Sequence, residues 1–188
     1  MRTLAITQNI TVDGSVEMLT DWFDPRGHGD VDNDDLLAET RRQDSQADAL
    51  LLGRRTFEDF RSYWPEQTDD PTGIADYLNE VHKYVVSTTL QAPEWVNSTI
   101  LDADPVAEVA ELKERATGLD IVVTGSITLS HALIRAGLVD EYRLFVHPAV
   151  QGRGRRLFPE DHEIPRLRLL ENKTFRGGVT FQRYAPAS

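Results

Sequence analysis

The stretch LLGRRTFE at residues 51–58 decides the fold, because it runs an apolar strand into a glycine, two arginines and a short helix. A second stretch, IVVTGSITL at residues 121–129, repeats the same strand–glycine–helix order. A helix N-terminus exposes unpaired N–H groups and a partial positive charge, which favour phosphate. Two such turns, one with arginines whose planar fork matches phosphate, suit a dinucleotide. The sequence therefore predicts a nicotinamide cofactor and a reductase.

The composition narrows the class of protein and its partners. The 188 residues fit one domain over residues 1–188. The 31 acidic and 20 basic residues give a net charge of −11, which disfavours nucleic acid and anionic membranes but permits a small phosphorylated ligand in a local basic pocket. There is no cysteine, which excludes disulfides, thiolate metal sites and a cysteine nucleophile. The five histidines do not occur at ligand spacing, so no metal is expected.

No apolar run approaches the ~18–20 residues of a membrane span. Residues 1–7 become polar too soon for a signal peptide, and we expect them to belong to a first strand. These features predict a cytoplasmic protein with a small-molecule substrate.

Strand and helix signals alternate up to residue 140 and are followed by alternating strands, which predicts a mostly parallel α/β sheet with antiparallel strands at its end. The expected strands are 2–10, 49–52, 83–87, 120–124, 141–150, 166–174 and 179–184, the last two joined by the Gly-Gly hairpin at 177–178. The expected helices are 34–47, 56–63, 70–81, 104–118 and 127–136. Residues 20–33 form a loop in which Trp22 is either a lid over a flat ring or an anchor.

Six segments in order carry a family resemblance: VDG at 12–14, LLGRRTFE at 51–58, KYVVSTTL at 83–90, WVN at 95–97, GLVDEYRL at 137–144 and HPAVQGRG at 147–154. Together they resemble the reductase domain of the bifunctional riboflavin-biosynthesis proteins, and the stand-alone bacterial proteins built on it. The resemblance covers nearly the whole chain. It implies a dihydrofolate reductase-like, three-layer fold with NADPH laid across the carboxyl ends of the sheet strands.

The resemblance also implies roles for particular residues. Those matched to the cofactor are Gly53, Arg54, Arg55 and Thr56 (adenosine-side phosphates), Ser87, Thr88 and Thr89 (adenine ribose), and Gly125, Ser126, Ile127 and Thr128 (diphosphate). Asp13 and Gly14 match the loop near the nicotinamide, and Trp22 falls in the loop over the substrate. The glycines could also serve only as strand-to-helix turns, and Thr56 as a helix cap.

Two positions depart from the pattern of this family. Thr88 stands where an arginine that would help hold a 2′-phosphate is common, and Ser126 replaces the second glycine of a Gly-Gly turn. The first departure weakens the preference for NADPH over NADH, so NADPH is expected and NADH is the less favoured cofactor. No GxGxxG triplet occurs, which excludes a Rossmann fingerprint.

The proton donor and the reaction stay open. A nicotinamide supplies the hydride, and a carboxylic acid or ordered water supplies the proton. The candidate acids, in order of preference, are Glu39, Asp35 and Asp13. The main interpretation is a reductase of a small heterocycle, similar to 5-amino-6-ribosylaminouracil phosphate reductase and acting on a CH-OH or C=N group. The alternatives are a non-catalytic ligand-binding protein on the same fold and a dihydrofolate reductase that requires Glu39.

A homodimer is also expected. Val179, Phe181 and the apolar part of Arg183 alternate along the last strand and could pair or stack with a second copy.

Overall fold

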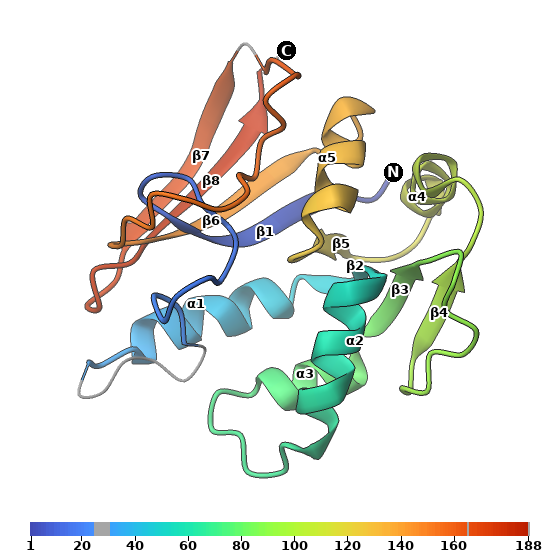
Figure 1. The fold of residues 1–188 in the computed structure, drawn as a ribbon, viewed down its shortest axis with the longest axis horizontal. Helices are drawn as coiled ribbons and strands as arrows, with labels where there is room; N and C mark the ends of the chain where they lie inside the picture. Colours follow the sequence, from blue (N-terminus) through green and yellow to red (C-terminus); the bar gives the residue numbers. More distant parts are fainter. Residues whose placement is uncertain (25–30, 165, 188) are drawn as a thin grey trace.

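The computed structural model describes residues 1–24, 31–164 and 166–187. Within them, eight strands form one sheet in the order β4-β3-β2-β5-β1-β6-β8-β7 (Figure 1). The strands are β1 (Leu4–Thr11), β2 (Ala47–Gly53), β3 (His82–Val86), β4 (Ser98–Leu101), β5 (Asp120–Val123), β6 (Glu141–His147), β7 (Leu167–Thr174) and β8 (Thr180–Pro186). Pairing is parallel from β4 to β6, and β8 runs antiparallel to both β6 and β7. The predicted mixed α/β sheet is confirmed.

Helices cover both faces of the sheet and complete the three layers. They are α1 (Asp34–Asp44), α2 (Arg54–Tyr63), α3 (Ile74–Glu80), α4 (Pro105–Glu114) and α5 (Ile127–Arg135), with a 3₁₀ turn η1 (Trp64–Glu66) after α2. In Figure 1, α1, α2 and α3 lie on the lower side of the sheet, and α4 and α5 lie on the upper side. Among the described residues, none of these helices combines the length and the apolar character needed to cross a membrane.

Alternate residues of the central strands enter different cores. Leu50 and Leu52 pack in the cluster that contains Phe57 of α2, whereas Leu51 packs in the cluster that contains Leu133 of α5. All five side chains are buried. Because such a strand is apolar on both faces, it appears in the sequence as a continuous hydrophobic run.

The third helix begins at Ile74, later than the sequence predicted. Gly73 has a left-handed φ of +81°, which interrupts the helical backbone before this point. The Asp70 carboxylate nevertheless accepts hydrogen bonds from the N–H groups of Thr72 and Ala75, each at 3.0 Å. Asp70 therefore caps the first turn from outside the helix.

Three further expectations differ from the structure. Strand β4 was not predicted; it is short, lies at the sheet edge and buries only Leu101 fully. Helix α1 ends at Asp44 instead of continuing to residue 47. The last two helices end earlier than expected, α4 at Glu114 and α5 at Arg135, so that Ala116 and Ala136 lie beyond them and are exposed.

Two of the three side chains expected at a homodimer interface, Val179 and Phe181, are not exposed. Val179 and Phe181 are buried within the monomer, in a small core with Phe145 and Phe175. Leu36 of α1 packs against the same core. The homodimer stays a prediction, and these two side chains cannot supply its interface.

Candidate functional site

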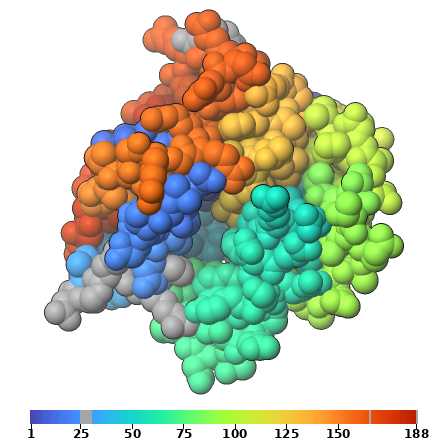
Figure 2. Space-filling view, in the orientation of Figure 1, coloured from blue at the N-terminus to red at the C-terminus, as the bar shows by residue number. Residues whose placement is uncertain are grey.

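One cavity of about 1240 Å³ opens at the carboxyl ends of the parallel strands. Its lining includes Gly53 at the end of β2, Val86 at the end of β3, Thr124 after β5 and His147 at the end of β6. Figure 2 shows the molecule hollowed between the segment that follows β1, in blue, and α2, in teal. In open α/β sheets this edge is the usual place for a ligand.

The N-termini of α2 and α5 both meet this cavity without a capping side chain. Helix α2 starts after Gly53 and α5 after Ser126, and within the described residues neither helix has a side-chain cap. The Asp104 carboxylate, by contrast, caps α4 by accepting from the N–H groups of Val106 and Ala107. The first N–H groups of α2 and α5 are therefore available to an anion.

The two turns are tied to each other by hydrogen bonds. The Gly53 N–H donates to Ser126 Oγ at 2.8 Å, and the Ser126 N–H donates to Thr56 Oγ1 at 3.0 Å. Gly125 has a φ of +58°, and a Cβ there would lie 2.8 Å from Thr56 Cγ2. The Gly125 N–H donates to Gln8 Oε1 of β1 at 3.1 Å. A glycine is thus required at position 125, and the two turns form one rigid cradle.

The residues matched to the cofactor divide into two groups. The members of the two turns all line the cavity: Gly53, Arg54, Arg55, Thr56, Gly125, Ser126, Ile127 and Thr128. The segment Ser87, Thr88 and Thr89 does not line it. There the Ser87 hydroxyl accepts hydrogen bonds from the N–H groups of Thr89 and Leu90, which closes a local turn after β3.

Two arginine side chains, Arg54 and Arg55, lie at the α2 end of the cavity. Arg54 pairs with Glu58 one turn along its own exposed helix face, at 3.1 Å, and such surface pairs are weak. Arg55 is exposed, and among the described residues it has no hydrogen-bond or ion-pair partner. Both side chains are therefore available to a ligand phosphate.

Aromatic rings form another wall of the cavity. The ring of His147 lies 5.3 Å from that of Trp22 and 5.5 Å from that of Phe23, both in edge-to-face geometry. The indole N–H of Trp22 donates to Gln151 Oε1 at 3.0 Å, and a ring nitrogen of His147 is hydrogen-bonded to Asn9 Oδ1 at 2.9 Å. Trp22 both lines the cavity and is anchored.

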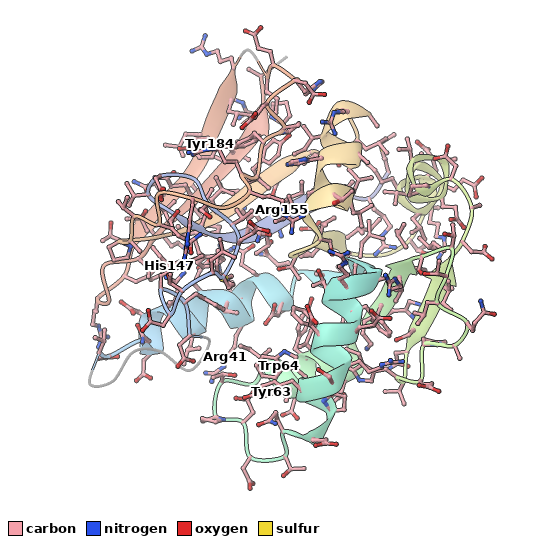
Figure 3. The ribbon with its side chains drawn as sticks, viewed as in Figure 1. Arg41, Tyr63, Trp64, His147, Arg155 and Tyr184 are labelled. Atoms are coloured by element: carbon pink, nitrogen blue, oxygen red, sulfur yellow. The ribbon has the colours of Figure 1, made fainter. Side chains whose placement is uncertain are left out.

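His147, the last residue of β6, lines the cavity as well. In the view of Figure 3, His147 lies above α1 and Trp64 below it. Trp64 also lines the cavity.

Asp13 and Gly14 lie outside the lining of the cavity. The Asp13 carboxylate accepts hydrogen bonds from Thr11 Oγ1 at 2.6 Å, from the Gln151 N–H at 3.1 Å and from the Gly152 N–H at 2.8 Å. These bonds, that from Thr11 foremost, lower the pKa of Asp13 to about 2. Asp13 therefore fixes the turn after β1 to the loop after β6 and remains ionised.

Glu39 is also outside the lining, in an ion cluster between α1 and β7. Its carboxylate accepts from Arg42 Nη2 at 2.7 Å, from Lys173 Nζ at 2.6 Å and from Gln43 Nε2 at 2.6 Å. Burial acts to raise the pKa of Glu39, but these hydrogen bonds outweigh it and lower the pKa to about 2. A carboxyl held this way is a structural anion and a poor proton donor.

Asp35, the third candidate acid, also lies outside the lining of the cavity. Its carboxylate accepts hydrogen bonds from the N–H groups of Leu36 at 2.9 Å and Arg176 at 3.0 Å, the latter in the β7–β8 hairpin. The structure thus brings none of the three candidate acids to the cavity.

The acid that does line the cavity from α1 is Asp44, which the sequence analysis missed. Burial raises its pKa to about 7. Leu37, Thr40 and Asp44 all line the cavity and follow one another at helical spacing, so they share one face of α1. That spacing was the signal available in the sequence.

Comparisons with known proteins match the whole chain. The family model described as RibD C-terminal domain matches residues 2–181. An uncharacterized protein of Bacillus subtilis, YyaP, is 32% identical over 186 residues, which cover 95% of this chain and 92% of that protein.

Solved structures show the same fold at lower identity. A putative riboflavin biosynthesis protein from Shewanella has a TM-score of 0.70 and 19% identity, with full coverage of both chains. A pyrimidine reductase-like protein from Corynebacterium diphtheriae has a TM-score of 0.64 and 16% identity, over 100% of this chain and 92% of that one. RibD of Acinetobacter baumannii has a TM-score of 0.67 and 14% identity, and this chain covers 59% of it. The chain belongs to the RibD C-terminal domain family.

Proposed function

We propose that this protein is an NADPH-dependent reductase that transfers a hydride to a small, flat heterocyclic substrate. Membership of the RibD C-terminal domain family supports an oxidoreductase with a small-molecule substrate. The observation that carries the proposal is that two uncapped helix N-termini, linked by hydrogen bonds, open onto one cavity that continues into an apolar space.

The cradle fits the phosphates of the cofactor. The first N–H groups of α2 and α5 would hold the diphosphate, and glycine at position 125 lets a ligand approach the backbone closely. Arg54 and Arg55 would hold the 2′-phosphate, which distinguishes NADPH from NADH. Because Thr88 does not line the cavity, this discrimination rests on the two arginines.

The remaining space suits a flat substrate beside the nicotinamide. Its lining includes Leu37 and Thr40 of α1, Phe60 of α2, Trp64 of η1 and Ile74 of α3. When bound, the nicotinamide would supply the hydride, and this apolar wall would orient the substrate and exclude water.

Calorimetric titration with NADPH and NADH tests the proposal. We expect NADPH to bind at micromolar concentration, and Arg54→Ala or Arg55→Ala to weaken it about tenfold, or about 1.4 kcal/mol, with a smaller effect on NADH. Arg135→Ala is the matched control, because Arg135 is an exposed arginine at the far end of α5 that pairs with Asp161. Equal and weak binding of both nucleotides, unchanged in these variants, would contradict the proposal.

One observation favours a second candidate, a non-catalytic ligand-binding protein with the same cavity. None of the acids Glu39, Asp35 and Asp13 reaches the ligand space. NADPH oxidation assayed at 340 nm with a panel of pyrimidines, pterins and other heterocycles separates the two, since only the reductase consumes the cofactor. Dihydrofolate reduction through Glu39 is not proposed, because the ion cluster with Arg42 and Lys173 engages that carboxylate.

A further inference from the structure

Gln8 is a buried polar side chain on the central strand β1, and it lines the cavity. It is only 4% exposed. Leu4, Ile6 and Ile10, which share its face of the strand, all pack in the apolar core that contains Leu133. A polar side chain in such a row needs hydrogen-bond partners, because burial without them is unfavourable.

One arm of the Gln8 amide has its partner within the protein. The Gly125 N–H donates to Gln8 Oε1 at 3.1 Å. A backbone N–H can only donate, so the oxygen of the amide must face Gly125 and the nitrogen must occupy the other arm. This bond holds the amide plane in place before any ligand arrives.

The other arm, Nε2, has no acceptor. Within residues 1–24, 31–164 and 166–187, no group accepts a hydrogen bond from it. The nitrogen is not sealed inside the protein either, and since Gln8 lines the cavity, its open surface faces the ligand space. A side chain buried this deeply, with two unused N–H bonds directed into a cavity, is suited to bind a ligand acceptor.

The position of Nε2 indicates which kind of acceptor it meets. Nε2 and Oε1 belong to the same amide, so Nε2 lies close to the turn that Gly125 forms before α5. The N-terminus of α5 lies at this turn without a side-chain cap. Its first N–H groups and the Gln8 amide are all donors, and the helix dipole adds a partial positive charge. A group that only accepts hydrogen bonds, and that carries negative charge, fits this set best.

We propose that Gln8 is part of the anion site at the N-terminus of α5 and donates Nε2–H to an oxygen of a bound phosphate group. The inference rests on the proposed function in one respect, because it identifies this phosphate with the diphosphate of the cofactor. It adds a side-chain donor from β1 to a cradle otherwise made of the turns after β2 and β5. Because the bond to Gly125 already fixes the amide, Gln8 loses little conformational freedom when the phosphate binds.

Inorganic pyrophosphate is the probe, titrated calorimetrically into the full chain alongside NADPH. We expect Gln8→Met, which has a similar length and no donor, to weaken both about tenfold or more. Gln8→Glu should weaken both as well, although it keeps an acceptor for the Gly125 N–H and so preserves the turn. Gln182 is the matched control for both substitutions: it lies outside the cavity and also accepts one hydrogen bond, from the Tyr184 hydroxyl at 3.1 Å.

NMR separates direct contact from a change of charge or of turn geometry. The side-chain NH₂ signal of Gln8, assigned by its absence from Gln8→Glu, should shift downfield in a proton–nitrogen spectrum when pyrophosphate or NADPH binds. A bound ligand that leaves this signal unmoved overturns the inference, and so does unchanged affinity in Gln8→Met.

The proposed cofactor and the role of Gln8 can fail separately. Tight NADPH binding that does not depend on Gln8 overturns this inference alone. Pyrophosphate binding that depends on Gln8, without NADPH binding, overturns the proposed cofactor and leaves the anion site standing. Binding of neither ligand by the unaltered protein overturns both.

Discussion

At the scale of single residues, Ser126 stands where the family pattern has the second glycine of a Gly-Gly turn. Its side chain contributes to the cradle formed by the turns after β2 and β5. Its φ of +51° lies in the left-handed region, which costs a non-glycine residue roughly 1–2 kcal/mol. Its hydroxyl offsets part of this cost by accepting the Gly53 N–H at 2.8 Å. The serine therefore links the turn after β5 to the turn after β2, which a second glycine could not do.

We expect Ser126→Ala to lower the free energy of unfolding by about 1–2 kcal/mol, because alanine keeps the left-handed backbone and leaves the Gly53 N–H unpaired. Ser126→Gly loses the same bond but also removes the strain, so it should stay within about 1 kcal/mol of the unaltered protein. Urea denaturation followed by tryptophan fluorescence measures both. A larger loss for Ser126→Gly than for Ser126→Ala would refute the explanation.

The acids of α1 show why the site was harder to predict than the cradle. Glu39 faces Lys173 of β7, and Asp44 faces the cavity. Five positions along a helix turn a side chain to a different face, but the thin apolar stripe of α1 did not indicate which face meets the ligand. The cradle was predictable because its glycines and arginines follow directly from strands that are apolar on both faces.

At the scale of elements, α3 is short and is held at both ends by side chains from outside it. At the start of α3, the Asp70 carboxylate accepts a hydrogen bond from the Ala75 N–H. At the end of α3, Lys83 Nζ donates to the carbonyl of Leu78 at 2.6 Å and to that of Val81 at 2.9 Å. A seven-residue helix has little stability of its own, so these caps matter. They fix the wall that Tyr77 and Leu78 present to the cavity.

We expect Asp70→Ala to lower the free energy of unfolding by about 1–2 kcal/mol, since it leaves the N–H groups of Thr72 and Ala75 without their acceptor. Amide hydrogen exchange should show the loss concentrated in α3. Asp69→Ala is the control: Asp69 is exposed and, among the described residues, has no hydrogen-bond partner. Equal destabilisation by both variants would contradict the capping role.

The elements that the sequence predicted best are those with strong local signals. Asp104 followed by a proline predicted the start of α4, and the Gly-Gly pair at 177–178 predicted the β7–β8 hairpin. The start of α3 was misplaced because Asp70 followed by a proline gives the same local signal, while Gly73 delays the helix. Strand β4 has no comparable signal, since only one of its residues is fully buried. Tertiary pairing with β3 creates it.

At the scale of the whole molecule, the cavity joins parts that are distant in the sequence. The cradle comes from the turns after β2 and β5, whereas the aromatic wall joins the segment after β1 to the end of β6. Two acids of α1, the buried Glu39 and the partly buried Asp44, also affect the stability of the entire fold, in opposite directions. Glu39 has a pKa lowered to about 2, so its stabilising contribution is present above the unfolded-state pKa and is lost as pH falls toward 2.

The contribution of Asp44 has the opposite sign. Its folded pKa, about 7, lies above the unfolded value of 3.8, so the folded state binds the extra proton between these values and stability falls as pH rises through this window. Asp44→Asn removes this loss of stability at high pH, because asparagine does not titrate. We therefore expect the variant to match the unaltered protein near pH 4 and to be more stable by roughly 1–3 kcal/mol near pH 8.

Urea denaturation at several pH values between these limits gives the difference directly. Asp34→Asn serves as the control, because Asp34 is an exposed acid of the same helix. A stability difference for Asp44→Asn that does not grow with pH would show that the Asp44 carboxyl is not held protonated by burial.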